Sequence, residues 1–298
     1  MSRANGKRRR IPPKGNDFEP GPIRWLPQPD SFGGRLQPLS RYAYLLDADD
    51  DLAQEFEVSI RAAVRRVATV QVLSVEVGDC ELHRLFEAVG RGFGLLILDG
   101  LVAFETGVGD RTACELIGSG DLLQAPCPRA EELLEQRDAW RALCPSHVAL
   151  LDEDFSERTR AWPQIGQALL RRSGRRIADA DALRAISGQP RLEVRLVLLM
   201  WHLATRWGRV EPGGIHLMLP LTHRLLGQLV AAERPSVSHA LARLNHSGLV
   251  TGHACDLHLH GTLEGHFEAL SERTTLGQLN ANRQAPPSTA VPAVHQAM

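Results

Sequence analysis

The pattern of residues 219–250 predicts two short amphipathic helices separated by a tight break. No other segment of this 298-residue chain constrains the fold as strongly. Thr222 can cap the first helix, and Leu226 and Leu229 give that helix an apolar inner face. The break is expected at residues 231–233. Two short helices joined by a tight turn form a helix-turn-helix unit, so the segment is predicted to be one.

The second helix of this unit is predicted over residues 234–246. Pro235 favours a start at this point, because a proline in the first turn removes no hydrogen bond that the helix needs. Gly248 supplies a left-handed cap just beyond the end. The apolar positions recur three and four residues apart, which predicts a buried stripe of Val237, Leu241 and Leu244.

The other face of the second helix carries polar side chains that suit DNA, namely Arg234, Ser236, Ser238, His239 and Arg243. The first turn of this helix enters the major groove in a helix-turn-helix, where Arg234 could bond O6 and N7 of a guanine through both arms of its guanidinium. Serine hydroxyls suit a phosphate or either base edge. The plainer interpretation is a surface helix in an all-α subdomain.

The spacing of five residues closely resembles the helix-turn-helix signature of the Crp/Fnr family of bacterial transcription regulators; they are Thr222, Gly227, Arg234, Val237 and Leu241. Upstream, residues 96–102 resemble the hairpin of the family's β-roll, and residues 118–123 resemble the lead-in to a later strand. Residues 163–186 correspond to the family's dimerising helix, and residues 249–251 and 257–260 to the two strands of a wing.

The resemblance implies an α+β fold with an N-terminal antiparallel β-roll of the cyclic-nucleotide-binding type, a long dimerisation helix and a C-terminal winged helix-turn-helix. Residues 1–38 and 280–298 are rich in proline and lack periodicity, so we expect a disordered arm and a disordered tail. Between them we place the β-roll sensor, the dimerisation helix and the DNA-binding domain at residues 39–155, 156–188 and 189–279.

Local patterns predict the individual elements upstream of the helix-turn-helix. Residues 45–128 are typical of short strands, including one over 64–72, and Asp99-Gly100 is a turn of the kind that closes a tight hairpin. Helices are predicted over residues 131–142, 156–187 and 192–207.

The segment after residues 118–123 departs from the family members that bind cyclic nucleotides. Those members carry a Gly-Glu pair and then an arginine, which hold the ribose and the cyclic phosphate. No Gly-Glu pair follows here, and Arg129-Ala130 precedes Glu131-Glu132, which would repel a phosphate. We therefore expect no cyclic AMP as cofactor, and the sequence identifies no other effector.

Composition argues against several other classes of protein. A formal net charge of −1 disfavours binding to nucleic acid by bulk charge. The five cysteines lie far apart without a Cys-x-x-Cys pair, so neither a structural zinc site nor a disulfide framework is indicated. The chain lacks the hydrolase, P-loop and zinc-protease motifs, and it lacks the run of ~20 apolar residues that crosses a membrane. We expect a cytoplasmic protein that is not an enzyme and has no membrane partner.

Metal-ligating residue types crowd the predicted wing, namely His253, Cys255, His258, His260 and His266. His258 and His260 alternate, so they share one face of a strand, and Cys255 or His253 could complete a tetrahedral site. The favoured interpretation is a polar wing whose histidines are solvated or lie near phosphate, so no metal site is predicted.

Together these patterns predict a sequence-specific, DNA-binding transcription regulator. It would act as a homodimer on a near-palindromic operator, and the resemblance implies RNA polymerase as a further partner. The residues expected at the DNA are Thr222, His223, Arg234, Pro235, Ser236, Ser238, His239 and Arg243. Two alternatives stay open: a ligand-sensing module whose helix-turn-helix binds protein, and a regulator switched by metal at the histidine-rich wing.

Overall fold

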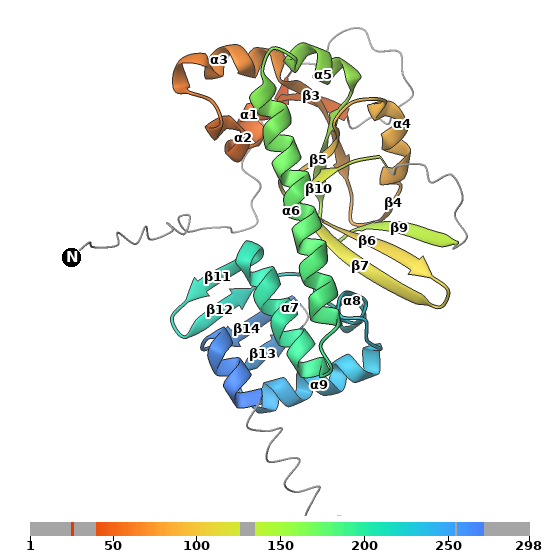
Figure 1. The fold of residues 1–298 in the computed structure, drawn as a ribbon, viewed down its shortest axis with the longest axis vertical. Coiled ribbons are helices and arrows are strands. Elements are labelled where there is room, and N and C mark those ends of the chain that lie inside the picture. Colours follow the sequence, from red (N-terminus) through yellow and green to blue (C-terminus); the bar gives the residue numbers. More distant parts are fainter. Residues whose placement is uncertain (1–24, 27–39, 126–134, 254, 271–298) are drawn as a thin grey trace, which may run out of the picture.

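The computed structural model describes residues 25–26, 40–125, 135–253 and 255–270. It has the predicted α+β fold, with an N-terminal β-roll, a long helix α6 (Pro163–Ser187) and a smaller C-terminal part. Figure 1 shows α6 running from the roll to the C-terminal part, so this helix touches both. The predicted arm at 1–38 lies almost wholly outside the described residues, and the tail at 280–298 lies wholly outside them.

Two antiparallel sheets form the roll. The six-stranded sheet has the order β1 (Trp25–Leu26), β2 (Ser40–Tyr44), β3 (Thr69–Val75), β10 (Ser146–Leu151), β5 (Gly94–Asp99) and β8 (Leu122–Leu123). The four-stranded sheet has the order β4 (Gly78–Cys80), β9 (Gln136–Ala142), β6 (Leu101–Val108) and β7 (Arg111–Gly118). Aliphatic side chains from both sheets fill the space between them, together with Trp140, whose ring stacks on Phe104 at a centroid distance of 4.2 Å.

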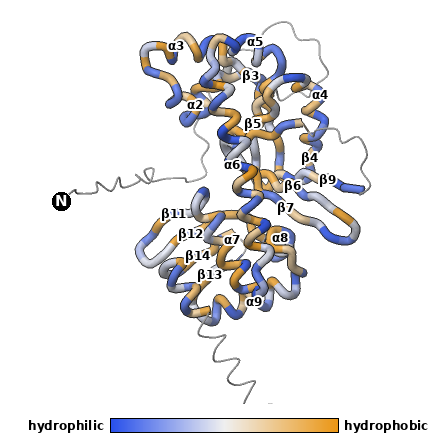
Figure 2. Tube along the Cα trace, in the orientation of Figure 1, coloured by the Kyte–Doolittle hydropathy of each residue, from blue (hydrophilic) through white to orange (hydrophobic). Residues whose placement is uncertain are grey.

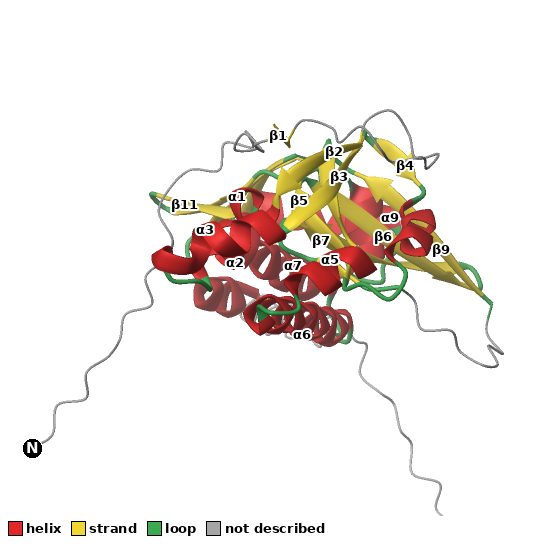
Figure 3. Ribbon diagram, turned by 90° about the horizontal axis from the view of Figure 1, so that it is seen from above, coloured by secondary structure: helices red, strands yellow, loops and turns green. Residues whose placement is uncertain are grey.

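Helices cover the outer face of the six-stranded sheet. They are α1 (Leu45–Ala48), α2 (Asp50–Gln54), α3 (Val58–Val67), α5 (Glu153–Thr159) and the first turns of α6. Figure 3 shows these helices gathered on one side of the strands. Two further short helices, η1 (Leu82–Arg84) and α4 (Leu85–Val89), close one end of the roll.

A buried ion pair joins α6 to this helical layer. Nη2 of Arg172 donates to Oδ1 of Asp49 at 2.7 Å, and the two side chains are only 7% and 8% exposed. Burial by itself would lower the pKa of Arg172, but the hydrogen bonds and charge of Asp49 raise that pKa above its ordinary value. Asp49 also caps α2 by accepting from the backbone N–H of Leu52 at 2.9 Å.

The C-terminal part is built on α7 (Leu192–Trp207) and a four-stranded antiparallel sheet. The sheet has the order β11 (Gly208–Glu211), β12 (Gly214–Leu217), β14 (Asp256–His260) and β13 (Val250–His253). Helices α8 (His223–Leu229) and α9 (Arg234–His246) complete this part. The wing strands predicted over 249–251 and 257–260 are confirmed as β13 and β14.

The roll and the C-terminal part share one apolar core. The face of β6 and β7 that points away from the roll interior contributes Leu101, Ala103, Cys114 and Leu116 to the cluster that α7, α8 and α9 bury. Figure 2 shows hydrophobic residues concentrated inside each part and around α7 and α8. The two parts therefore pack against each other and are not merely tethered.

Several element predictions are wrong, and each fails where distant partners decide the structure. Residues 58–67 are helical, so the strand predicted over 64–72 begins only at Thr69. Residues 136–142 form strand β9 instead of a helix, because β4 and β6 lie on either side and supply hydrogen bonds. The helix predicted over 156–187 is two helices, α5 and α6, separated by residues 160–162.

The Asp99-Gly100 turn is present, but it closes no hairpin. It carries the chain from β5 in one sheet to β6 in the other. Gly100 has a φ of +92°, and a Cβ at this position would lie 2.1 Å from Oγ of Ser146, so only glycine allows this close approach. Among the described residues, no helix is both long and apolar enough to span a bilayer.

Candidate DNA-binding site

Helices α8 and α9 form the predicted helix-turn-helix. Thr222 caps α8, as predicted, by accepting from the backbone N–H of Leu225 at 3.2 Å. In the turn, Ala231 adopts a left-handed conformation with a φ of +53°, and the N–H of Ala232 donates to the carbonyl of Gly227 at 2.8 Å. A Cβ on Gly227 would lie 2.5 Å from the carbonyl oxygen of Ala232, so the turn can pack this closely only against glycine.

The buried side of α9 differs in one position from the predicted stripe. Val237 and Leu244 are buried, as predicted, but Leu241 is only partly buried, and Ala240 is buried beside them. These side chains pack into the core that α9 shares with α7 and α8. Because this side of α9 is buried, the opposite side of the helix faces solvent.

The exposed side of α9 carries the strongest predicted DNA contact. Arg234 is the first residue of the helix and is exposed, and within the described ranges its guanidinium has no ion-pair partner. Pro235 occupies the first turn, as predicted, and Pro235, Ser236 and His239 are also exposed. The first two turns of α9 thus present an unpaired arginine fork beside small polar groups.

Ser238, predicted at the DNA, is instead engaged between the two helices. It is half-buried, its Oγ lies 2.8 Å from Nδ1 of His223, and its hydroxyl donates to the carbonyl of Arg234 at 3.1 Å. With the serine proton donated to that carbonyl, Oγ accepts from the His223 ring. The pair ties α8 to α9, which is a structural role that the helical spacing alone did not reveal.

Arg243, also predicted at the DNA, is held by α7. Its Nε donates to Oε1 of Glu193 at 2.6 Å. Burial would raise the pKa of Glu193, but its own backbone N–H and the guanidinium of Arg243 together hold that pKa below its ordinary value. Sequence reasoning missed this pair because the two residues are 50 positions apart.

Three polar contacts hold the helix-turn-helix against the roll, and sequence reasoning missed all of them. Glu233, just before α9, forms an ion pair with Arg111 of β7. In α8, Gln228 donates to Oε2 of Glu105 at 2.9 Å, and Arg224 lies 3.9 Å from the same oxygen. The start of α9 is therefore positioned by the roll as well as by its own domain.

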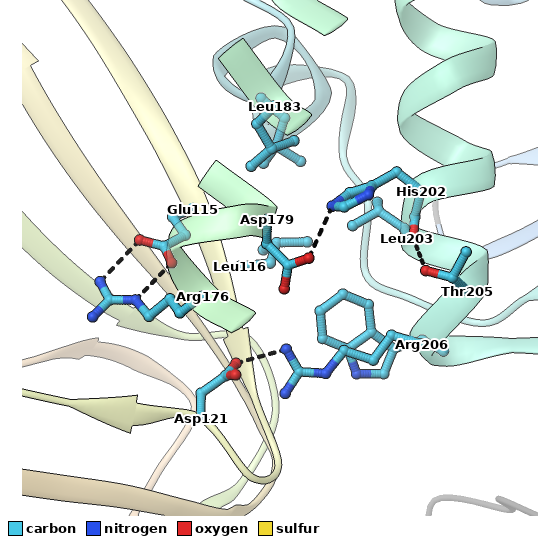
Figure 4. A pocket seen from close by; sticks show the side chains of 12 residues that line it. Glu115, Leu116, Asp121, Arg176, Asp179, Leu183, His202, Leu203, Thr205 and Arg206 are labelled. Atoms are coloured by element: carbon cyan, nitrogen blue, oxygen red, sulfur yellow. Dashed lines mark hydrogen bonds and ion pairs between the residues drawn. The ribbon is translucent and has the colours of Figure 1, made fainter. Parts of the chain in front are cut away.

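A cluster of charged residues closes the junction between β7, α6 and α7 (Figure 4). Arg176 donates to both carboxylate oxygens of Glu115 at 2.7 and 2.9 Å, and Arg206 donates to Oδ2 of Asp121 at 2.7 Å. The carboxylate of Asp121 is buried and also accepts from the backbone N–H of Gly118 at 2.8 Å. These pairs line the pocket that Figure 4 shows, and they connect the roll to α6 and α7.

The metal-ligating residue types that crowd the wing sequence are not brought together as one group within the described residues. His253 and Cys255 are exposed, whereas His266 is buried and bonds to the carbonyl of His260. His260 itself bonds through Nε2 to Oγ1 of Thr251 at 2.6 Å. Within the described residues, His258 instead lies near Glu211 of β11, His216 of β12 and Asp256 of its own strand. The residues on which the cyclic AMP expectation rests, 124–132, lie mostly outside the described residues.

Comparisons with known proteins agree with this architecture. Residues 194–260 match the Crp-like helix-turn-helix domain. No curated protein matches the chain in sequence.

Solved structures share the fold at low sequence identity. A cyclic nucleotide-binding domain containing protein from Listeria monocytogenes EGD-e has a TM-score of 0.53 at 13% identity, with 71% of this chain and 96% of that chain covered. A mutant of CooA from Carboxydothermus hydrogenoformans has a TM-score of 0.51 at 14% identity, with coverages of 75% and 93%. The c-di-GMP responsive global regulator CLP from Xanthomonas campestris has a TM-score of 0.50 at 18% identity, with coverages of 67% and 100%.

The family match and the shared fold confirm the resemblance found in the sequence. Residues 194–260 match the Crp-like helix-turn-helix domain, and they are joined to a β-roll in the fold that these solved structures share.

Proposed function

We propose that this chain is a sequence-specific transcription regulator that inserts α9 into the major groove of DNA. The observation that carries the proposal is the exposed guanidinium of Arg234, which has no ion-pair partner among the described residues and lies in the first turn of a helix whose other face is buried. In this class of motif, the first turn of the second helix meets base edges. An arginine there bonds bidentately to guanine.

The surrounding residues divide into two groups in this proposal. Ser236 is exposed and suits a phosphate, His239 is exposed and would modulate base preference, and Thr222 opens α8 at the DNA backbone. Ser238 and His223 hold the two helices together. Arg243 reaches a phosphate only if it leaves Glu193, so it contributes less to affinity than its position suggests.

The proposal also includes a homodimer formed along α6. Leu170 and Ile177 lie on one side of this helix, seven residues apart, and they are 70% and 64% exposed. Two large apolar side chains left in water on the same helical stripe favour a second copy of α6 as their cover. A two-fold dimer would place two copies of α9 about one DNA turn apart, roughly 34 Å. The proposal also includes RNA polymerase as a further partner and a cytoplasmic location, and the family resemblance supports both.

Selection from a pool of random duplex DNA tests the function. The purified chain should enrich a two-fold symmetric sequence whose half-sites are about 10 base pairs apart. The selection is run without additions and again with a small-molecule extract of bacterial cells, because an effector could be required. A chain that enriches no sequence under either condition would contradict the proposal.

Substitutions on α6 test the dimer. Replacing both Leu170 and Ile177 with aspartate should convert the dimer to a monomer, because the carboxylates would have to be buried across the two-fold interface. Sedimentation velocity at micromolar concentration measures the change. Val210→Asp is the matched control, since Val210 is 70% exposed on β11, away from α6. If the double variant stays dimeric, α6 is not the interface.

A further inference from the structure

One face of the C-terminal sheet gathers imidazole and carboxylate groups from three strands. His216 of β12 and His258 of β14 are direct partners in the antiparallel register. Glu211 lies on β11, which pairs with β12 on its other side. Alternate residues of a strand point to the same face, and the intervening residues Ile215, Leu217, Leu257 and Leu259 belong to the apolar core on the opposite face.

The three side chains are close enough to share one ion. One potential ligand atom from each of Glu211, His216 and His258 lies within 4.8 Å of the other two, and all three residues are half-buried. The two imidazole rings stack at a centroid distance of 4.1 Å with an interplanar angle of 10°. Nδ1 of His216 lies 3.5 Å from Oε1 of Glu211.

We propose that Glu211, His216 and His258 form a binding site for a divalent transition-metal ion of the Zn²⁺ class. Two neutral imidazoles and one carboxylate are a ligand set that Zn²⁺ accepts, with water in the fourth position. Ligand atoms around a tetrahedral zinc ion are separated by roughly 3.3 Å, because each bond is about 2.0–2.2 Å long. The ligand atoms now lie within 4.8 Å of one another, so they must draw closer, and the two stacked rings must turn until both in-plane lone pairs meet the ion.

Asp256 supplies the support that such a site needs. Its Oδ1 lies 2.5 Å from Nε2 of His216 and 3.2 Å from Nε2 of His258. Both rings therefore direct Nε2 to the same carboxylate, which leaves Nδ1 of each ring as the donor to a metal. A metal-binding histidine commonly donates its other ring N–H to a carboxylate, which fixes the tautomer and the ring orientation.

The alternative explanation is an ion-pair network without metal. In that network the two imidazoles would keep only the carboxylate contacts that the structure shows, and no ion would bind. This site also differs from the wing group considered in the sequence, since His258 is the only residue that the two have in common.

The site would connect the β11–β12 hairpin to the β13–β14 wing. Glu211 and His216 belong to the β11–β12 hairpin and His258 to the β13–β14 wing, so one ion would cross-link the two hairpins. A ligand that binds only the folded state raises its stability. The proposal does not depend on DNA binding, and its test uses no DNA.

Zinc titration of the full chain tests the proposal. Protein freed of metal with a chelator is titrated with Zn²⁺ in competition with a chromophoric chelator. We expect one Zn²⁺ per chain, an affinity at least about 10-fold lower in His216→Gln, His258→Gln and Glu211→Gln, and a loss of about 10-fold in Asp256→Asn. His253→Gln is the matched control, because His253 is exposed on β13 of the same sheet and should bind zinc as the parent does.

Two further readouts separate a lost site from a damaged fold. Thermal unfolding of the metal-free variants should match that of the metal-free parent, whereas added Zn²⁺ should raise the melting temperature of the parent but not of His216→Gln. Co²⁺ in place of Zn²⁺ should give a visible spectrum without a sulfur-to-metal charge-transfer band. Unchanged zinc affinity in His216→Gln, lost affinity in Cys255→Ser, or no binding by the parent would each overturn the proposal.

Discussion

Arg234→Ala should weaken binding to the selected operator by about 5- to 150-fold for each half-site. This range corresponds to the roughly 1–3 kcal/mol of discrimination that a bidentate arginine–guanine contact supplies. Arg234 is exposed in the first turn of α9, and no ion pair within the described part of the chain competes for its guanidinium. Fluorescence anisotropy with labelled operator DNA at fixed salt measures the loss.

Two other arginines make this result specific. Arg243→Ala should cost less than Arg234→Ala, because Arg243 is already paired with Glu193. Arg84→Ala removes one positive charge from an exposed ion pair in the roll and should leave operator affinity nearly unchanged. If Arg234 reads a base, its loss should also relax the preference at one position of the site, whereas loss of a phosphate contact weakens all sequences alike. Equal affinity and unchanged specificity in Arg234→Ala would exclude this residue from base recognition.

Asp49→Ala should lower the free energy of unfolding by about 3–5 kcal/mol. Removing one partner of a buried ion pair leaves an uncompensated charge in the protein interior, and this cost is large. Arg172 is 7% exposed, and Asp49 is its bonded partner across α6 and α2. Urea denaturation followed by circular dichroism measures the change.

The control for this prediction is an ion pair on the surface. Glu81 pairs with Arg84 at 2.9 Å, but the side chains are 58% and 67% exposed, so Glu81→Ala should cost no more than about 1 kcal/mol. Combining Asp49→Ala with Arg172→Met should recover part of the loss, because the unpaired buried charge is then removed as well. A single Asp49→Ala change that costs no more than Glu81→Ala would show that the buried pair does not stabilise the fold.

The helix-turn-helix could be predicted from the sequence because its determinants are local. The cap at Thr222, the close turn packing at Gly227 and the start at Pro235 all lie within a few positions of the contacts they make. Arg234 is exposed as predicted because the buried stripe alone fixes the orientation of α9. Its role in base recognition remains a prediction.

The sequence did not reveal features that depend on distant pairing. Residues 136–142 are a strand because β4 and β6 flank them, and their own composition does not favour one. The hydrogen-bond partners of Arg243 and Ser238 could not be predicted because Glu193 and His223 approach them from other helices. His216 and His258 become neighbours only through the register of β12 and β14, so the spacing within the wing could not identify them as a pair.

The apolar face that β6 and β7 share with α8 limits the way in which α9 can be repositioned. Separating the helix-turn-helix from the roll would expose buried side chains of this face, such as Leu116 and Leu226, to water. Closely packed elements instead slide past one another by small displacements. A displacement of α9 relative to the roll is therefore expected to be a small shear that keeps this apolar face covered.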